Sequence, residues 1–243
     1  MIITHVRLMD PTEKRQQWKR RRIYLMRHGD VSYFDASGRP FRPDTVPLNE
    51  AGRLQAEAAG RLLADVPIDR VVASDLQRSI ETASLATAGR SSRLQTLAQL
   101  REIQPGRLAD IPVQDIETAF TKAFAIDLTP DARFLGGETL GSLIDRVQSC
   151  FQLLLADTAW NQLLIVAHGG VNRVILASAL GVALPGFAAF EQDPGCLNIL
   201  DVDSSGRMLV RLVNYTPDNP IKKGLELTTM ESLYLQYCDR RTT

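Results

Sequence analysis

Residues 22–29 read RIYLMRHG, and this stretch decides the fold of a chain of 243 residues. Its centre is a short apolar run of β-favouring residues, which predicts a strand buried on both faces. Two similar runs follow, DRVVA at 69–73 and QLLIVA at 162–167. Because helical patterns separate the runs, they predict a largely parallel sheet with helices packed on it.

The segments between and after these strands complete the predicted architecture. Asn49 is expected to cap a helix that Pro67 ends, and Ser74 to cap a helix that runs to about Ala88. Further helices are predicted at 113–126, 139–157 and 171–180, a short strand within 93–100, and a hairpin from 196–202 and 208–215. The pattern predicts a three-layer α/β/α sandwich with a mostly parallel central sheet and an antiparallel edge.

The chain is expected to hold one domain between two less regular ends. Residues 1–21 form a basic leader, residues 22–216 the domain, and residues 217–243 a tail. The leader is interpreted as a solvated arm, with a nucleic-acid or membrane-surface contact as the alternative. The tail carries an amphipathic stripe that is expected to pack on the domain, with a homodimer contact as the alternative: Leu227, Met230, Leu233, Tyr234 and Tyr237.

Composition excludes several functional classes. Basic and acidic residues number 28 each, which argues against a nucleic-acid partner, and 44% hydrophobic residues argue against disorder. Three widely spaced cysteines and three histidines favour neither a disulfide framework nor a metal site. No apolar run is long enough for a membrane span or a signal peptide, so we expect a soluble, cytoplasmic protein.

Two of the three histidines follow predicted strands. His28 ends the first strand and His168 ends the third, and a glycine comes directly after each. Ligands of open parallel sheets bind beyond the carboxyl ends of the strands. Both histidines are therefore expected at one binding site, where glycine lets the backbone approach a ligand closely.

Two arginines are expected at the same edge. Arg27 precedes His28, and Arg78 lies in the first turns of the helix after the second strand. A guanidinium group binds phosphate oxygens in a bidentate manner, and a helix N-terminus favours an anion. Two histidines and two arginines at one sheet edge predict a site for a phosphoryl group.

Six sequence blocks in this order resemble the histidine phosphatase superfamily, the phosphoglycerate mutase-like proteins, in its phosphatase-type branch. The blocks span most of residues 23–202. They are RHG at 27–29, PLNEAGRLQA at 47–56, SDLQRSIETA at 74–83, LREI at 100–103, GET at 137–139 and HGGVNR at 168–173.

The resemblance implies a phosphohistidine mechanism without a metal or other cofactor, acting on a small phosphorylated metabolite. His28 would be the nucleophile. Arg27, Arg78 and His168 would hold the phosphoryl oxygens with help from the backbone N–H of Gly169. Glu102 would protonate the leaving oxygen and then accept a proton from water.

The sequence departs from the family after the first block. Phe34 stands where many members have an asparagine that contacts phosphate, and Ser32 is a candidate replacement. Arg39 and Arg42 either bind a second anionic group of the substrate or are solvated. The leading hypothesis is a phosphatase. The alternatives are phosphoglycerate mutase-type transfer and a phospho-ligand-binding scaffold with little turnover.

Overall fold

The computed structural model describes residues 19–33, 41–42, 44–125, 127–182 and 184–239. Phe34, Arg39 and most of the predicted basic leader lie outside these residues. Among the residues that the structure describes, no helix combines the length and apolarity needed to cross a bilayer.

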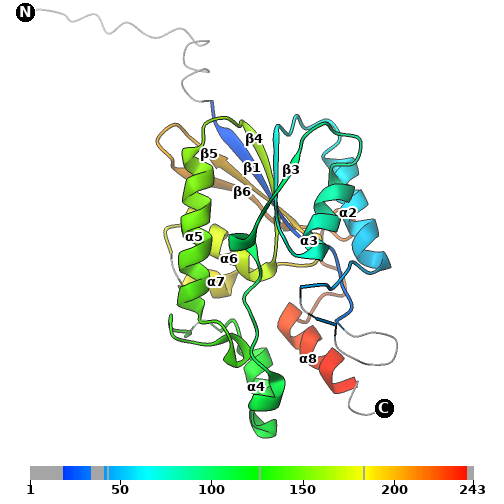
Figure 1. Cartoon of the computed structure of the whole chain (residues 1–243), viewed down its shortest axis with the longest axis vertical. Helices are drawn as coiled ribbons and strands as arrows, with labels where there is room; N and C mark the ends of the chain where they lie inside the picture. The colour runs from blue at the N-terminus through cyan, green and yellow to red at the C-terminus, as the bar shows by residue number, and fades with distance from the viewer. Residues whose placement is uncertain (1–18, 34–40, 43, 126, 183, 240–243) are drawn as a thin grey trace, which may run out of the picture.

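A six-stranded sheet forms the middle of the molecule (Figure 1). Its order is β3-β2-β4-β1-β5-β6; β3, β2, β4 and β1 run parallel, whereas β5 is antiparallel to both β1 and β6. The strands are β1 (Arg21–Arg27), β2 (Arg70–Ser74), β3 (Leu94–Leu97), β4 (Gln162–Ala167), β5 (Leu197–Val202) and β6 (Met208–Tyr215). The predicted mostly parallel sheet with an antiparallel hairpin at its edge is confirmed.

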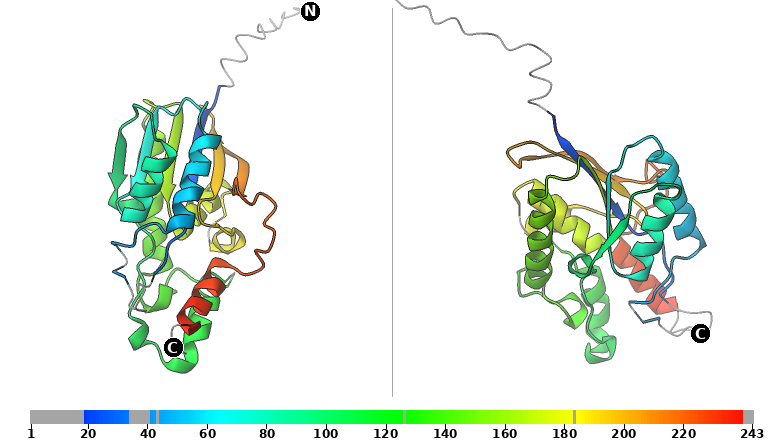
Figure 2. Two further views of the ribbon diagram at one scale, coloured as in Figure 1. Left: turned by 90° about the vertical axis from the view of Figure 1, so that its right-hand side faces the viewer. Right: turned by 45° about the horizontal axis from the view of Figure 1, so that its top comes forward.

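Helices cover both faces of the sheet and one of its ends. One face carries α2 (Glu50–Leu62) and α3 (Gln77–Ala86), and the other carries α5 (Leu140–Ala156), α6 (Gly169–Ala179) and α7 (Leu184–Ala189). Two further helices, α4 (Ile116–Thr121) and α8 (Thr229–Asp239), lie together beyond the carboxyl ends of the parallel strands (Figures 1 and 2). The predicted three-layer sandwich is confirmed.

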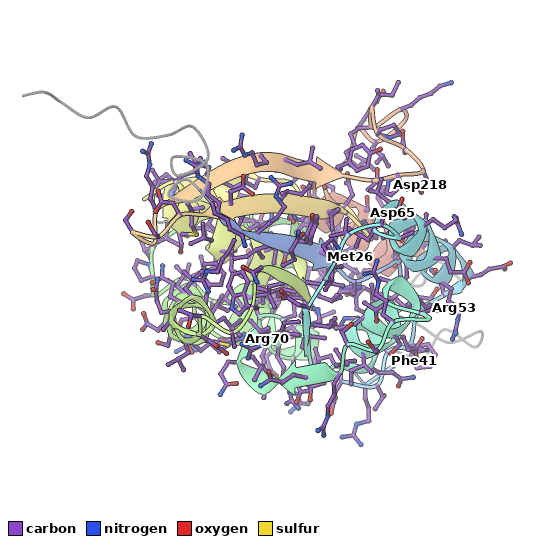
Figure 3. The ribbon with its side chains drawn as sticks, turned by 90° about the horizontal axis from the view of Figure 1, so that it is seen from above. Met26, Phe41, Arg53, Asp65, Arg70 and Asp218 are labelled. Atoms are coloured by element: carbon purple, nitrogen blue, oxygen red, sulfur yellow. The ribbon has the colours of Figure 1, made fainter. Side chains whose placement is uncertain are left out.

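The side chains of β1 alternate between two apolar cores. Tyr24 and Met26 pack toward α2 and α3, while Ile23 and Leu25 belong to the larger cluster beneath α5 and α6. Seen from above, Met26 lies in the interior of the molecule, whereas the charged Arg53 lies at its periphery (Figure 3). Burial of β1 on both faces explains its continuous apolar sequence and fixes the direction of Arg27 and His28 at its end.

Some predicted helix boundaries need correction. Asn49 caps α2 as expected, because its Oδ1 accepts from the N–H of Gly52 at 2.8 Å. Ser74 does not cap α3: it pairs with Leu97 as the last residue of β2, and the helix begins at Gln77. The helix expected at 113–126 is shorter, with a 3₁₀ turn at Val113–Asp115 before α4.

Candidate active site

His28 and His168 lie side by side at the carboxyl edge of the sheet. Each histidine follows its strand directly, and β1 and β4 are parallel neighbours that end in the paired residues Arg27 and Ala167. The two imidazole centroids are 5.1 Å apart at an interplanar angle of 61°. Both rings are buried. The pairing of the two strands therefore brings together the residues that the sequence predicted at one edge.

The hydrogen bonds of His28 define its protonation. Its Nδ1 lies 2.7 Å from the carbonyl oxygen of Gly29, which can only accept, so Nδ1 carries the proton. Its Nε2 accepts from Nε of Arg78 at 3.3 Å. His28 is therefore a neutral imidazole whose Nε2 lone pair faces the arginine.

Burial and nearby cations keep both histidines neutral. Desolvation, followed by the charges of Arg78 and Arg27, holds the pKa of His28 well below its ordinary value. Desolvation also lowers the pKa of His168 well below its ordinary value, with smaller contributions from Arg78 and His28. Both effects disfavour a charged imidazole, so each ring is neutral at pH 7.

Two guanidinium groups are buried beside the histidines. Arg27 is 6% exposed and Arg78 is 4% exposed. Nη1 of Arg27 donates to the carbonyl of Gln192 and to the hydroxyl of Thr229. Within the described part of the chain, Nε of Arg27 and Nδ1 of His168 have no hydrogen-bond partner, although both are buried. A buried guanidinium with an N–H that lacks a partner favours an anionic ligand.

Glu102 faces the N-terminus of α6. Both of its carboxylate oxygens accept from the N–H of Gly170 at 3.2 Å, and Oε1 also accepts from the N–H of Ile103 at 2.9 Å. A Cβ atom on Gly170 would lie 2.5 Å from Oε1 of Glu102, so a larger residue at this position would displace the carboxylate. Glu102 therefore lies at the same edge as the histidines.

Gly169 lies between two of the predicted site residues. A Cβ atom added to it would lie 3.7 Å from both Nε of Arg27 and Oε2 of Glu102. The structure thus brings Arg27, His28, Arg78, Glu102, His168 and Gly169 to one edge of the sheet. Ser32 and Arg42 are exposed, and Arg42 lies 3.9 Å from Asp44.

Arg146 of α5 fixes the loop that carries Glu102. Its guanidinium makes a bidentate pair with Glu138, with distances of 2.8 and 3.0 Å. It also donates to the carbonyl oxygens of Gln99, Arg101 and Glu102. Arg146 was not predicted from the sequence to lie near the site. The available signal was Glu138 in the GET block, which had no assigned partner.

The chain is an α/β sandwich in which two buried histidines and two buried arginines lie at the carboxyl edge of the sheet. It belongs to the histidine phosphatase superfamily (branch 1), whose family model matches residues 23–215.

Its relatives have phosphatase and mutase names. A probable 2-carboxy-D-arabinitol-1-phosphatase of Arabidopsis thaliana is 28% identical over 84% of this chain and 44% of that protein, so the chain spans less than half of that relative. A probable phosphoglycerate mutase GpmB of Proteus mirabilis is 30% identical over 68% of this chain and 77% of that protein.

A solved structure supports the same family. The alpha-ribazole phosphatase from Shigella flexneri is 26% identical, with a TM-score of 0.67 over 79% of this chain and 96% of that one. The predicted family and fold are confirmed. The predicted enzyme class, a phosphoric monoester hydrolase, agrees with the phosphatases among these proteins.

Proposed function

We propose that this protein is a metal-independent phosphatase that hydrolyses a small phosphomonoester through a phosphohistidine on His28. The neutral His28 carries the proposal, because its Nε2 lone pair lies at an edge lined by two buried arginines and His168. The phosphatases among the relatives support the same reaction class.

In the first step, Nε2 of His28 attacks phosphorus and forms a P–N bond. The bond from phosphorus to the ester oxygen breaks, and its electron pair goes to that oxygen. The carboxyl group of Glu102 donates the proton that the leaving oxygen needs. Arg27, Arg78, His168 and the N–H of Gly169 stabilise the charge on the phosphoryl oxygens.

In the second step, water attacks the phosphohistidine. The carboxylate of Glu102 accepts a proton from the water, the P–N bond breaks, and the electron pair returns to Nε2 of His28. Inorganic phosphate leaves, and both residues return to their starting states. The low pKa of His28 supports this cycle, because the free imidazole is restored as a neutral nucleophile.

The proposed substrate is a small phosphorylated metabolite. Two relatives are named for such compounds, a carboxyarabinitol phosphate and an alpha-ribazole phosphate. The charge needed to stabilise the transition state comes from side chains at this edge, so the reaction as proposed requires neither a metal nor another cofactor.

Turnover of 4-nitrophenyl phosphate in the presence of EDTA tests the proposal. The wild type should release nitrophenol, and His28→Ala should lower the rate to background, a loss on the order of 10⁶-fold. His5→Ala is the matched control, because it removes a histidine with no assigned role and should retain full activity. Rapid quenching should trap an acid-labile phosphoenzyme in the wild type only.

Three results would contradict parts of this mechanism. Inhibition by the chelator would remove the metal-independent route, and turnover without a phosphoenzyme would remove His28 as the nucleophile. Conversion of one phosphoglycerate isomer into the other, faster than release of inorganic phosphate, would favour the mutase alternative, which the name of one relative motivates. A screen of phosphorylated metabolites would then identify the substrate.

A further inference from the structure

Helix α8 lies outside the region that matches the family model, yet it packs against the candidate site. The match ends at residue 215, and α8 begins at Thr229. Phe120 of α4 contacts two tyrosines of α8, with centroid distances of 5.9 Å to Tyr234 and 5.8 Å to Tyr237. Figures 1 and 2 show the two helices together beyond the sheet edge.

The first residue of α8 contacts a guanidinium of the candidate site. Nη1 of Arg27 lies 3.1 Å from Oγ1 of Thr229. The same hydroxyl lies 2.8 Å from Oε1 of Glu191. An ionised carboxylate can only accept, so the single hydroxyl proton points to Glu191 and the oxygen lone pairs point to Arg27.

Glu191 is itself held in place. Its Oε1 lies 3.0 Å from Nη2 of Arg173, which is 4% exposed and donates through Nη1 to the carbonyl oxygen of Phe187. Burial alone would raise the pKa of Glu191. The Arg173 charge and the hydrogen bonds from Gln192 and Thr229 together outweigh burial, so the pKa is lowered and the carboxylate stays ionised. The proton direction at Thr229 is therefore set by a carboxylate that a buried arginine holds in place.

Two nitrogen atoms of the Arg27 guanidinium, Nη1 and Nε, differ in their hydrogen-bond partners. Nη1 is bound by Thr229 and by the carbonyl oxygen of Gln192. Nε lies on the side of Gly169 and has no hydrogen-bond partner within the described residues. A donor group oriented in advance binds its ligand with less entropic cost.

We propose that Thr229 is a positioning residue that orients Arg27 for the phosphoryl group, and that α8 is part of the phosphate site. This inference rests on the proposed function, because it assigns phosphate as the ligand of Arg27. In this proposal Glu191 holds the hydroxyl of Thr229, and Arg173 holds Glu191.

Binding of inorganic phosphate by isothermal titration calorimetry tests the inference. Thr229→Val removes the hydroxyl at nearly constant shape and should weaken phosphate affinity about 10-fold or more, the scale of a hydrogen bond to a charged group. Thr229→Ser restores the hydroxyl and should bind within about 3-fold of the wild type. Thr229→Ala serves as a second variant if the valine disturbs folding.

Thr228→Val is the matched control. Thr228 and Glu231 form a reciprocal cap of α8, in which Thr228 N donates to Glu231 at 2.7 Å and Glu231 N donates to Thr228 Oγ1 at 3.2 Å. This variant weakens the same helix without removing the hydroxyl at Arg27. Its phosphate affinity should stay within about 3-fold of the wild type, even where its melting temperature falls.

The outcomes separate this inference from the proposed function. Equal losses of affinity in Thr229→Val and Thr228→Val, or no rescue by Thr229→Ser, would overturn the positioning role. Wild-type protein that binds phosphate but does not hydrolyse phosphomonoesters would overturn the proposed function alone. Wild-type protein that does not bind phosphate would overturn both.

Discussion

The surroundings of His28 determine which of its nitrogens is protonated, where the other nitrogen points, and whether the ring is charged. The backbone carbonyl of Gly29 defines which nitrogen carries the proton, and Arg78 defines where the other nitrogen points. Burial keeps the ring uncharged. None of these three conditions is a property of histidine itself, whose free side chain is partly charged near neutral pH.

The first prediction concerns the protonation of the two buried histidines. Since desolvation and nearby arginines lower their pKa values, both rings should remain neutral well below pH 6.5. Arg78→Met removes one of the lowering charges, so the pKa of His28 should rise. The imidazole signals in proton NMR, recorded from roughly pH 4.5 to 8, measure this directly.

The titration needs few assignments, because the chain contains only three histidines. Arg53→Met is the control: it removes a half-exposed arginine of α2 and should leave the pKa of His28 unchanged. A wild-type His28 that titrates at its ordinary value would show that the ring is not desolvated as the structure indicates.

At the scale of elements, an irregular loop carries Glu102 and a regular helix fixes it. Arg146 projects from α5 and binds three carbonyl oxygens of residues 99–102. Glu138 holds the guanidinium in a bidentate pair and also accepts from the N–H of Gln104. Residues 101–107, which follow a 3₁₀ turn at Ala98–Leu100, thereby acquire a definite position without regular secondary structure.

Replacing Arg146 should affect reactions that need a proton donor most strongly. Lysine cannot make the bidentate pair or reach all three carbonyl oxygens, so Arg146→Lys should displace Glu102. Turnover of an alkyl phosphate such as glycerol 2-phosphate should fall on the order of 10²-fold, because its leaving oxygen requires protonation. Turnover of 4-nitrophenyl phosphate should fall much less.

The ratio of the two rates is the informative measurement. Arg22→Lys is the control, because Arg22 makes a similar bidentate pair with Asp201 between β1 and β5. That variant should leave the ratio unchanged. An equal decrease for both substrates in Arg146→Lys would mean that the loop is not positioned for acid catalysis.

A second element-scale prediction concerns the contact between α2 and the turn after β1. A Cβ atom on Gly52 would lie 2.1 Å from the backbone oxygen of Asp30, and backbone cannot yield as a side chain can. Gly52→Ala should therefore lower the free energy of unfolding by about 3 kcal/mol. Urea denaturation measures this change.

Glu57→Ala on the same helix provides the comparison. Its carboxylate is half-exposed and lies 4.0 Å from Arg61, so the variant should change the free energy of unfolding by less than about 0.5 kcal/mol. A similarly small effect of Gly52→Ala would show that α2 can move away from the turn without cost.

For the whole molecule, the sequence predicted what depends on continuous local patterns. Strand β1 and helix α5 carry their periodicity in adjacent residues, so both appeared near their predicted positions. The parallel sheet then predicted that His28 and His168 meet. The contacts of Thr229 and Arg146 could not be predicted, because they join segments with no local pattern that relates them.

The same limit explains the error at Ser74. A serine three residues before Gln77 is a good capping pattern, but pairing with β3 extends the strand through that residue. Tertiary pairing therefore overrode a local preference. The amphipathic stripe of α8 was recognised, whereas its contact with Arg27 depended on the fold of the entire chain.

The buried histidines should also make global stability depend on pH. Their folded-state pKa values lie below the unfolded value of about 6.5, so the unfolded chain binds more protons as the pH falls. Above about pH 6.5 the histidines are neutral in both states, so the stability that depends on them is fully present. Below about pH 6.5 the unfolded chain takes up protons that the folded chain does not, so this stability decreases. The free energy of unfolding should fall by up to about 1.4 kcal/mol per pH unit for each histidine.

Urea titrations between about pH 7.5 and 5 measure this slope in a range above the ordinary titration of carboxylates. His168→Gln should remove about half of the slope. A free energy of unfolding that stays constant over this range would contradict the shifted pKa values.

The contact between Arg27 and Thr229 joins residues 202 positions apart. Closing so long a loop is slow compared with forming local structure, so this contact should assemble late in refolding. Trp160, buried beside α5, can recover its native fluorescence once the larger core has condensed. During refolding, phosphate binding should return later than the native fluorescence. The delay between the two signals measures the time that α8 needs to dock on the domain.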